Sequence, residues 1–150
     1  MQTARIEPLK QMLKSKLFIM DKDLAEIIKN STYSVISGTY KYLKIKNPPK
    51  AGEHFAVIED QDEITVVTTS EKAKQLSVSQ INEKNYALIA LNVSIPFYSV
   101  GFLSGISGAI ARRNMNILII STFSRDYILV DYKRVKEAQD ALDTLGLKQL

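Results

Sequence analysis

The chain has 150 residues, of which 45% are hydrophobic and 24% are charged, and its formal net charge is +4. This composition is typical of a soluble globular protein with one ordinary domain or two very small ones. The chain has no cysteine and a single histidine, His54, which excludes a disulfide scaffold, a thiol nucleophile and a multi-histidine metal site. We therefore expect a cytoplasmic protein that is not an enzyme and that has no cofactor or metal.

The charges are distributed unevenly along the chain. Residues 1–50 carry ten basic and four acidic side chains, residues 51–100 carry three and seven, and residues 101–150 carry seven and five. A basic first third is found in proteins that contact nucleic acid, but these lysines are dispersed, so we interpret them as a solvated helix face. No run approaches the roughly 18 apolar residues of a membrane span. Residues 1–30 also lack the apolar region of a signal peptide, so we expect neither feature.

The first thirty residues have the period of amphipathic helices. Apolar side chains recur at steps of three and four positions between Ile6 and Ile28. The helical pattern ends at Asn30, after which β-branched and aromatic residues become frequent. We therefore expect an N-terminal helical extension over residues 1–31.

Residues 32–82 predict several strands and one short helix. The composition from Tyr33 to Ile45 is typical of one long strand, or of two strands broken at Gly38. The other expected elements are a loop at 47–52, strands at 54–58 and 64–69 that form a hairpin, and a short helix that begins at Ser70.

Residues 83–150 predict the order strand, helix, strand, strand, helix. The apolar run at 86–93 is nearly continuous, which is typical of a strand buried on both faces. Asn114 and Gly146 stand where helices commonly end in a left-handed residue. Two half-size ferredoxin-like units of the α+β class fit this order, and a single mixed sheet with helices on one face is the alternative. The expected strands are 86–93, 117–123, 127–130 and 147–150, and the expected helices are 99–113 and 135–145.

Three of the six glycines lie close together, at Gly101, Gly105 and Gly108. Because a glycine costs a helix about 1 kcal/mol relative to alanine, this cluster needs a reason. The segment is neither a phosphate loop nor a dinucleotide fingerprint, since the spacing and the accompanying residues are wrong for both. We interpret Gly105 and Gly108 as packing positions, and Gly101 as the residue that exposes free N–H groups at a helix N-terminus, where an anion is favoured.

The segment that begins Gly101-Phe102-Leu103 resembles the ACT-domain pattern, in which Gly-x-Leu and a small-residue helix precede Asn-Ile and an apolar strand. With the continuation at 121–130, the chain resembles the tandem-ACT family. That family includes small bacterial amino-acid-binding proteins, the CASTOR arginine sensors and the aspartate kinase regulatory domains. The likeness is strong over 86–131 and weak before residue 82. It implies an α+β fold of two βαββαβ units in tandem, a degenerate one at 32–82 and an ACT domain at 83–150, after the helical extension.

The resemblance also implies a function. It implies a non-catalytic regulatory or sensor protein that binds a free amino acid at an interface between ACT units, forms a homodimer and controls a further protein. The implied ligand-binding residues are Phe97, Tyr98, Ser99, Val100, Gly101, Phe102, Asn116, Ile117, Thr122, Phe123 and Asp126. The arginine sensors carry acidic residues before the glycine, whereas this chain has apolar and hydroxyl side chains there. Arginine is therefore not the implied ligand.

Simpler roles for these residues remain open. Phe97, Phe102 and Phe123 would also serve as ordinary core residues, and Asp126 would also serve as the cap of a hairpin turn.

Two other functions of the protein remain open as well. The first is a structural oligomerisation module, because an apolar strand at the edge of a sheet can pair with a strand of another chain. RNA binding on an open ferredoxin-like sheet is disfavoured because the expected strands at 117–123 and 127–130 contain no lysine or arginine, so we do not expect nucleic acid as a partner. We do not expect a membrane as a partner either, since no apolar run is long enough to span one.

Overall fold

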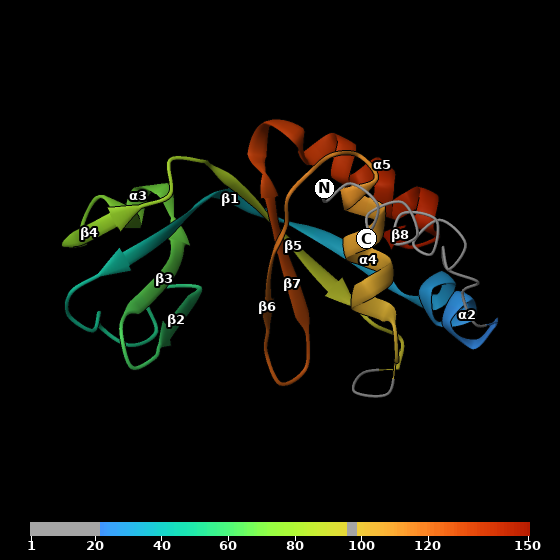
Figure 1. The fold of residues 1–150 in the computed structure, drawn as a ribbon, viewed down its shortest axis with the longest axis horizontal. Helices are drawn as coiled ribbons and strands as arrows, with labels where there is room; N and C mark the ends of the chain where they lie inside the picture. Colours follow the sequence, from blue (N-terminus) through green and yellow to red (C-terminus); the bar gives the residue numbers. More distant parts are fainter. Residues whose placement is uncertain (1–21, 96–98) are drawn as a thin grey trace, which may run out of the picture.

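The computed structural model describes residues 22–95 and 99–150 (Figure 1). The helix expected before residue 22 and the site residues Phe97 and Tyr98 therefore lie outside the described residues. Within them, no helix is long and apolar enough to cross a membrane. The elements, in chain order, are α2 (Lys22–Asn30), β1 (Thr32–Ile45), β2 (Ala56–Glu59), β3 (Ile64–Thr69), α3 (Ser70–Ala73), β4 (Val78–Ile81), β5 (Tyr86–Asn92), α4 (Phe102–Ala111), β6 (Leu118–Ser121), β7 (Asp126–Asp131), the 3-10 turn η1 (Tyr132–Arg134), α5 (Val135–Leu145) and β8 (Lys148–Gln149).

β1 is one continuous strand that serves both halves of the sheet. Its first part, 32–36, pairs with β5, and its second part, 40–45, pairs with β3, both antiparallel. The register with β5 shifts between Ile36 and Tyr40. Gly38 lies within this shift at a φ of 102°, a conformation that glycine adopts without strain. The sequence allowed one strand or two, and the structure has one strand with an irregularity at the glycine.

Both halves of the sheet have the ferredoxin-like strand order. In the N-terminal half the order is β2-β3-β1-β4, with the loop at 46–55 in place of a first helix and α3 as the second. In the C-terminal half the order is β6-β7-β5, followed by the first part of β1 in the fourth place, and β8 pairs with β1 in parallel. The α+β class with two ferredoxin-like units is thus confirmed. The division at residues 82 and 83 stays a prediction, since β1 pairs with strands on both sides of it.

The strand β4 was not predicted from the sequence. All four of its residues are exposed, and the segment Val-Ser-Gln-Ile lacks the clear alternation that marks a half-buried strand. Its partner is β1, which it joins at Leu43 and Ile45. The pairing therefore depends on a neighbour more than thirty residues away rather than on the local pattern.

Three helices, α2, α4 and α5, cover one face of the C-terminal half (Figure 1). The core beneath them includes Ile89 of β5, Ile106 of α4 and Leu142 of α5, all fully buried. β5 is buried on both faces, as its continuous apolar run predicted. The opposite face of the C-terminal half packs against the N-terminal half. There, the ring centroids of Phe55 and Tyr127 lie 4.8 Å apart.

The local signals for helix ends are confirmed. Asn114, just after α4, has a φ of 53°, and Gly146, the C-cap of α5, has a φ of 119°. Tyr33 anchors β1 to α5, because its hydroxyl donates to the Asp143 carboxylate at 2.8 Å. Burial and this carboxylate raise the pKa of the Tyr33 hydroxyl above its ordinary value, so it remains protonated as a donor.

Candidate functional site

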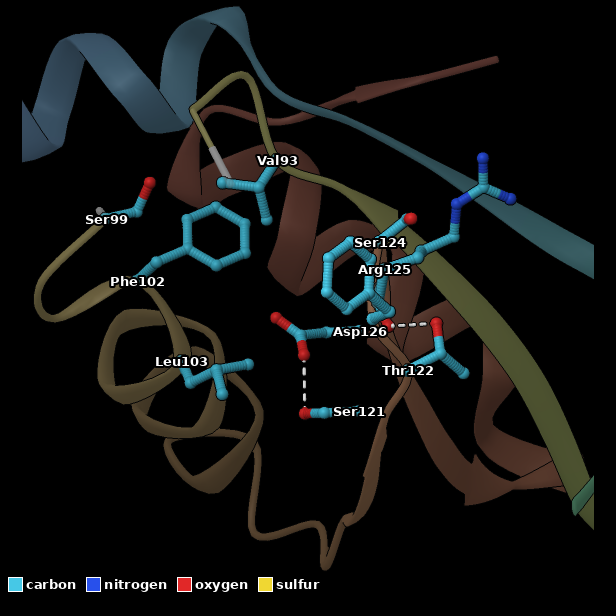
Figure 2. Close-up of a pocket in the computed structure, with 10 residues that line it drawn as sticks. Val93, Ser99, Phe102, Leu103, Ser121, Thr122, Ser124, Arg125 and Asp126 are labelled. Carbon is cyan, nitrogen blue, oxygen red and sulfur yellow. Dashed lines mark hydrogen bonds between the residues drawn. The ribbon is translucent and has the colours of Figure 1, made fainter. Parts of the chain in front are cut away.

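A pocket of about 300 Å³ lies where the N-terminal end of α4 faces the turn between β6 and β7 (Figure 2). Three segments form it: the end of β5, the start of α4 and the β6–β7 turn. Its volume is at the lower end of the range for small-molecule sites. The lining residues are Val93, Ser99, Phe102, Leu103, Ser121, Thr122, Phe123, Ser124, Arg125 and Asp126.

Gly101 fixes the start of α4. It is the N-cap residue, and its φ of 86° is in the left-handed region that favours glycine. The N–H of Phe102 donates to the Ser99 carbonyl at 3.1 Å. The next N–H group with an acceptor is that of Gly105, which donates to the Gly101 carbonyl at 2.9 Å. The N–H groups of Leu103 and Ser104, which lie between them, have no acceptor among the described residues. Such groups, together with the helix dipole, favour an anion.

Asp126 brings a negative charge to the same pocket. It begins β7 opposite Ser121, whose Oγ donates to Asp126 Oδ1 at 2.5 Å. Figure 2 shows its carboxylate directed toward α4, whereas the Arg125 guanidinium points away from it. The turn itself is closed by Thr122, whose N–H and Oγ1 both donate to the Arg125 carbonyl, at 2.8 and 2.9 Å. The role of turn cap thus falls to Thr122 rather than to Asp126.

The remaining wall of the pocket is mostly apolar. Phe102 is only 2% exposed, so it belongs to the hydrophobic core and lines the pocket at the same time. Val93 and Leu103 are half-buried against that core. Phe123 is 85% exposed and therefore forms part of the rim. The pocket thus combines the first turn of α4, where two N–H groups have no acceptor among the described residues, with one carboxylate and an apolar wall.

The structure brings together part of the predicted site. Five of the eleven predicted residues line the pocket, namely Ser99, Phe102, Thr122, Phe123 and Asp126. Val100 and Gly101 lie in the segment that enters α4, and the Val100 side chain is 90% exposed.

The two predicted residues before β6 lie elsewhere. Asn116 lines a separate hollow of about 70 Å³ together with Lys84 and Arg134. Ile117 packs against the core. Because Asn116 precedes β6 and Thr122 follows it, the two lie at opposite ends of that strand.

Five lining residues were not predicted: Val93, Leu103, Ser121, Ser124 and Arg125. The signal for Ser121 was present in the hairpin, because a turn at 122–125 places residue 121 opposite residue 126. Leu103 is next to the predicted Phe102 in the first turn of α4, and both residues line the pocket. The start of the helix was therefore a signal for Leu103 as well. Val93 lies just after the end of β5, and no local pattern marks it as a pocket residue.

Comparison with known proteins agrees with this architecture. Residues 82–144 match the family model of the ACT domain, while comparison with curated proteins finds no match. A Vibrio cholerae protein of unknown function, described as a possible transport protein, has a TM-score of 0.74 at 20% identity, covering 83% of this chain and 97% of that chain. An Agrobacterium tumefaciens protein has a TM-score of 0.69 at 17% identity, covering 80% and 92%.

The regulatory subunit of aspartate kinase from Thermus flavus has the same fold. Its TM-score is 0.58 at 11% identity, and the match covers 76% of this chain and 96% of that subunit. At such identities, the likeness to these solved structures concerns the fold alone. The family match and the ferredoxin-like order of β5, β6 and β7 agree on the same segment. Over residues 82–144, this chain therefore matches the ACT domain both in its sequence and in its strand order.

Proposed function

We propose that this protein binds a free amino acid in the pocket at the start of α4 and acts as a non-catalytic regulatory or sensor protein of the cytoplasm. The observation that carries the proposal is the Asp126 carboxylate, directed toward α4 in a small pocket at the first turn of that helix, where two N–H groups have no acceptor among the described residues. Further support comes from the ACT-domain match and from the aspartate kinase regulatory subunits that share the fold.

The chemistry of the pocket suits the two charged groups of an amino acid. The N–H groups of Leu103 and Ser104 would bind the α-carboxylate, and Asp126 would bind the α-ammonium through charge-assisted hydrogen bonds. The side chain would then lie against the apolar wall. An amino acid of about ten heavy atoms at roughly 0.7 kcal/mol each would have a dissociation constant near 10 μM.

The pocket favours a neutral side chain on the ligand. The hydroxyls of Ser99, Ser121 and Thr122 already donate to acceptors within the chain, so they are not available to a side-chain carboxylate. The Arg125 guanidinium points away from Asp126. A cationic side chain would compete with the α-ammonium for Asp126. We therefore expect aliphatic amino acids to bind more tightly than aspartate, glutamate, lysine or arginine.

A thermal-shift screen of the twenty amino acids tests the proposal. A ligand at 100 times its dissociation constant adds about 2.7 kcal/mol of stability, which raises the Tm of a chain of this size by about 5–10 °C. The largest shift should come from an aliphatic L-amino acid. Its D-enantiomer is the matched control and should give a much smaller shift, because it cannot place ammonium, carboxylate and side chain together. No shift with any amino acid would contradict the proposal and favour a structural module.

We also propose that the protein is a homodimer that pairs through β6. Among the described strands β6 pairs only with β7, and its sequence Leu-Ile-Ile-Ser has no charge or proline to block edge pairing. Ile119 on this edge is 41% exposed. Sedimentation should show a dimer at tens of micromolar and a monomer for Ile119→Lys. Ile58→Lys on β2, another edge strand, is the control and should remain dimeric, whereas a monomeric wild type would contradict the proposal.

A further inference from the structure

α2 packs where glycines let it approach α4 and α5 closely. Its buried side chains are Leu24 and Ile28. A Cβ atom at Gly101 would lie 3.0 Å from Leu24 Cδ2, closer than ordinary packing allows. A Cβ atom at Gly105 would lie 3.5 Å from Ile28 Cδ1, and one at Gly146 would lie 3.6 Å from Ile28 Cγ2. α2 therefore contacts Gly101, the residue that fixes the start of α4 and with it one side of the pocket.

The C-terminal end of α2 is bonded to the segment that follows β5. Ser31, which is fully buried, donates through its Oγ to the Ile27 carbonyl at 2.7 Å and accepts from the N–H of Ser94 at 3.0 Å. Ser94 Oγ also donates to the Ile27 carbonyl, at 3.1 Å. Because Ser94 follows Val93 of the pocket wall, α2 holds the chain on both sides of the pocket.

Few buried side chains dock α2 against the part of the chain that the structure describes. The helix has nine residues, and helices shorter than about 12–15 residues are marginal without tertiary packing. Among its described side chains, Leu24 and Ile28 are buried in the core and Ile27 is half-buried against it. An element held by so few buried side chains belongs to the less stable part of a fold, where local opening equilibria are sensitive to ligands.

We propose that α2 reports whether the pocket is occupied. An amino acid bound at the start of α4 orders the pocket around Gly101 and Val93, and this stabilises α2 in its docked position. The stability of docked α2 thereby depends on whether the pocket is occupied. This inference rests on the proposed function. The coupling is reciprocal. If a bound amino acid favours the docked position of α2 by some factor, release of α2 must lower the affinity for the amino acid by the same factor.

Hydrogen–deuterium exchange of the full chain tests the coupling, with a mixture of the twenty amino acids at about 1 mM each as the probe, well above the expected dissociation constant. We expect the mixture to slow exchange at 102–105, where the ligand binds, and also in α2, by roughly fivefold or more. Protection at 102–105 without protection of α2 would overturn this inference and leave the proposed function intact. Absence of protection at 102–105 would overturn both.

Variants on α2 separate coupling from binding. Titration of the mixture gives the concentration at which protection of 102–105 is half complete. Leu24→Ala should raise this concentration roughly fivefold or more, because it removes the contact with Gly101. Glu26→Ala is the matched control on the exposed face of α2 and should leave it unchanged.

Ser94→Ala weakens the second link, of which only the bond from the Ser94 N–H to Ser31 Oγ remains, and it guards against a folding defect in Leu24→Ala. It removes the hydrogen bond to the Ile27 carbonyl while the core contacts of α2 stay intact. It should also raise the concentration for half protection. Equal values for the wild type, Ser94→Ala and Leu24→Ala would contradict the coupling.

Discussion

Gly101→Val should lower the free energy of unfolding by about 2–5 kcal/mol and remove amino-acid binding. The residue has a φ of 86°, which a β-branched side chain adopts only with strain. Its Cβ would also lie 3.0 Å from Leu24 Cδ2, so that the buried Leu24 side chain must shift, and the γ-methyl groups of valine add to the crowding. We expect the start of α4 to move in response to the strain and the crowding, which displaces the N–H groups of Leu103 and Ser104 on which binding of the carboxylate depends.

Gly52→Val is the matched control for this change. Gly52 has a φ of 81°, close to that of Gly101, but a Cβ there meets no atom within 4 Å. This variant should therefore incur the backbone strain alone, about 1–2 kcal/mol, and bind amino acids normally. Chemical denaturation and calorimetric titration measure both quantities. Wild-type affinity in Gly101→Val would remove the start of α4 from the binding site.

Asp126→Asn should weaken amino-acid binding by about 1.5–3 kcal/mol while leaving the fold intact. Asparagine keeps an Oδ1 that accepts from the Ser121 hydroxyl, and the turn is closed by Thr122 rather than by Asp126. The variant loses the negative charge that faces the α-ammonium, so the cost falls on binding. Calorimetry should show a dissociation constant raised at least tenfold, with an unchanged Tm in the absence of amino acid.

Asp62→Asn controls for the loss of one negative charge. Asp62 lies in the exposed turn between β2 and β3, on the N-terminal half of the sheet. Its substitution changes the net charge equally and should leave amino-acid affinity unchanged. If Asp126→Asn bound as tightly as Asp62→Asn, Asp126 would have no role in recognition.

Local patterns predicted much of the fold. The apolar run of β5, the hairpin of β2 and β3, and the caps at Asn114 and Gly146 each depend on neighbouring residues, and all are confirmed. The sharing of β1 between the two halves was not predicted. A strand of fourteen residues reveals its length in the sequence, but its partners are chosen by packing and register with distant strands.

The site was predicted in part for a similar reason. Phe102, Thr122 and Asp126 come together because a helix start and a hairpin turn meet at one end of the sheet. Asn116 does not join them, because about six residues of extended chain, roughly 20 Å, separate it from Thr122. Val93 was missed because its place in the pocket is set by the packing of β5 beneath α4.

NMR would show at the level of single residues whether an amino acid binds at the first turn of α4. Nitrogen–proton correlation spectra would be recorded while the protein is titrated with the amino acid that gives the largest thermal shift. The amide signals of Leu103 and Ser104 should move downfield as their N–H groups bond to the carboxylate. At a ligand concentration near the wild-type dissociation constant, they should move much less in Asp126→Asn. Signals of Leu103 and Ser104 that stay fixed while the wild type binds the amino acid would contradict the account.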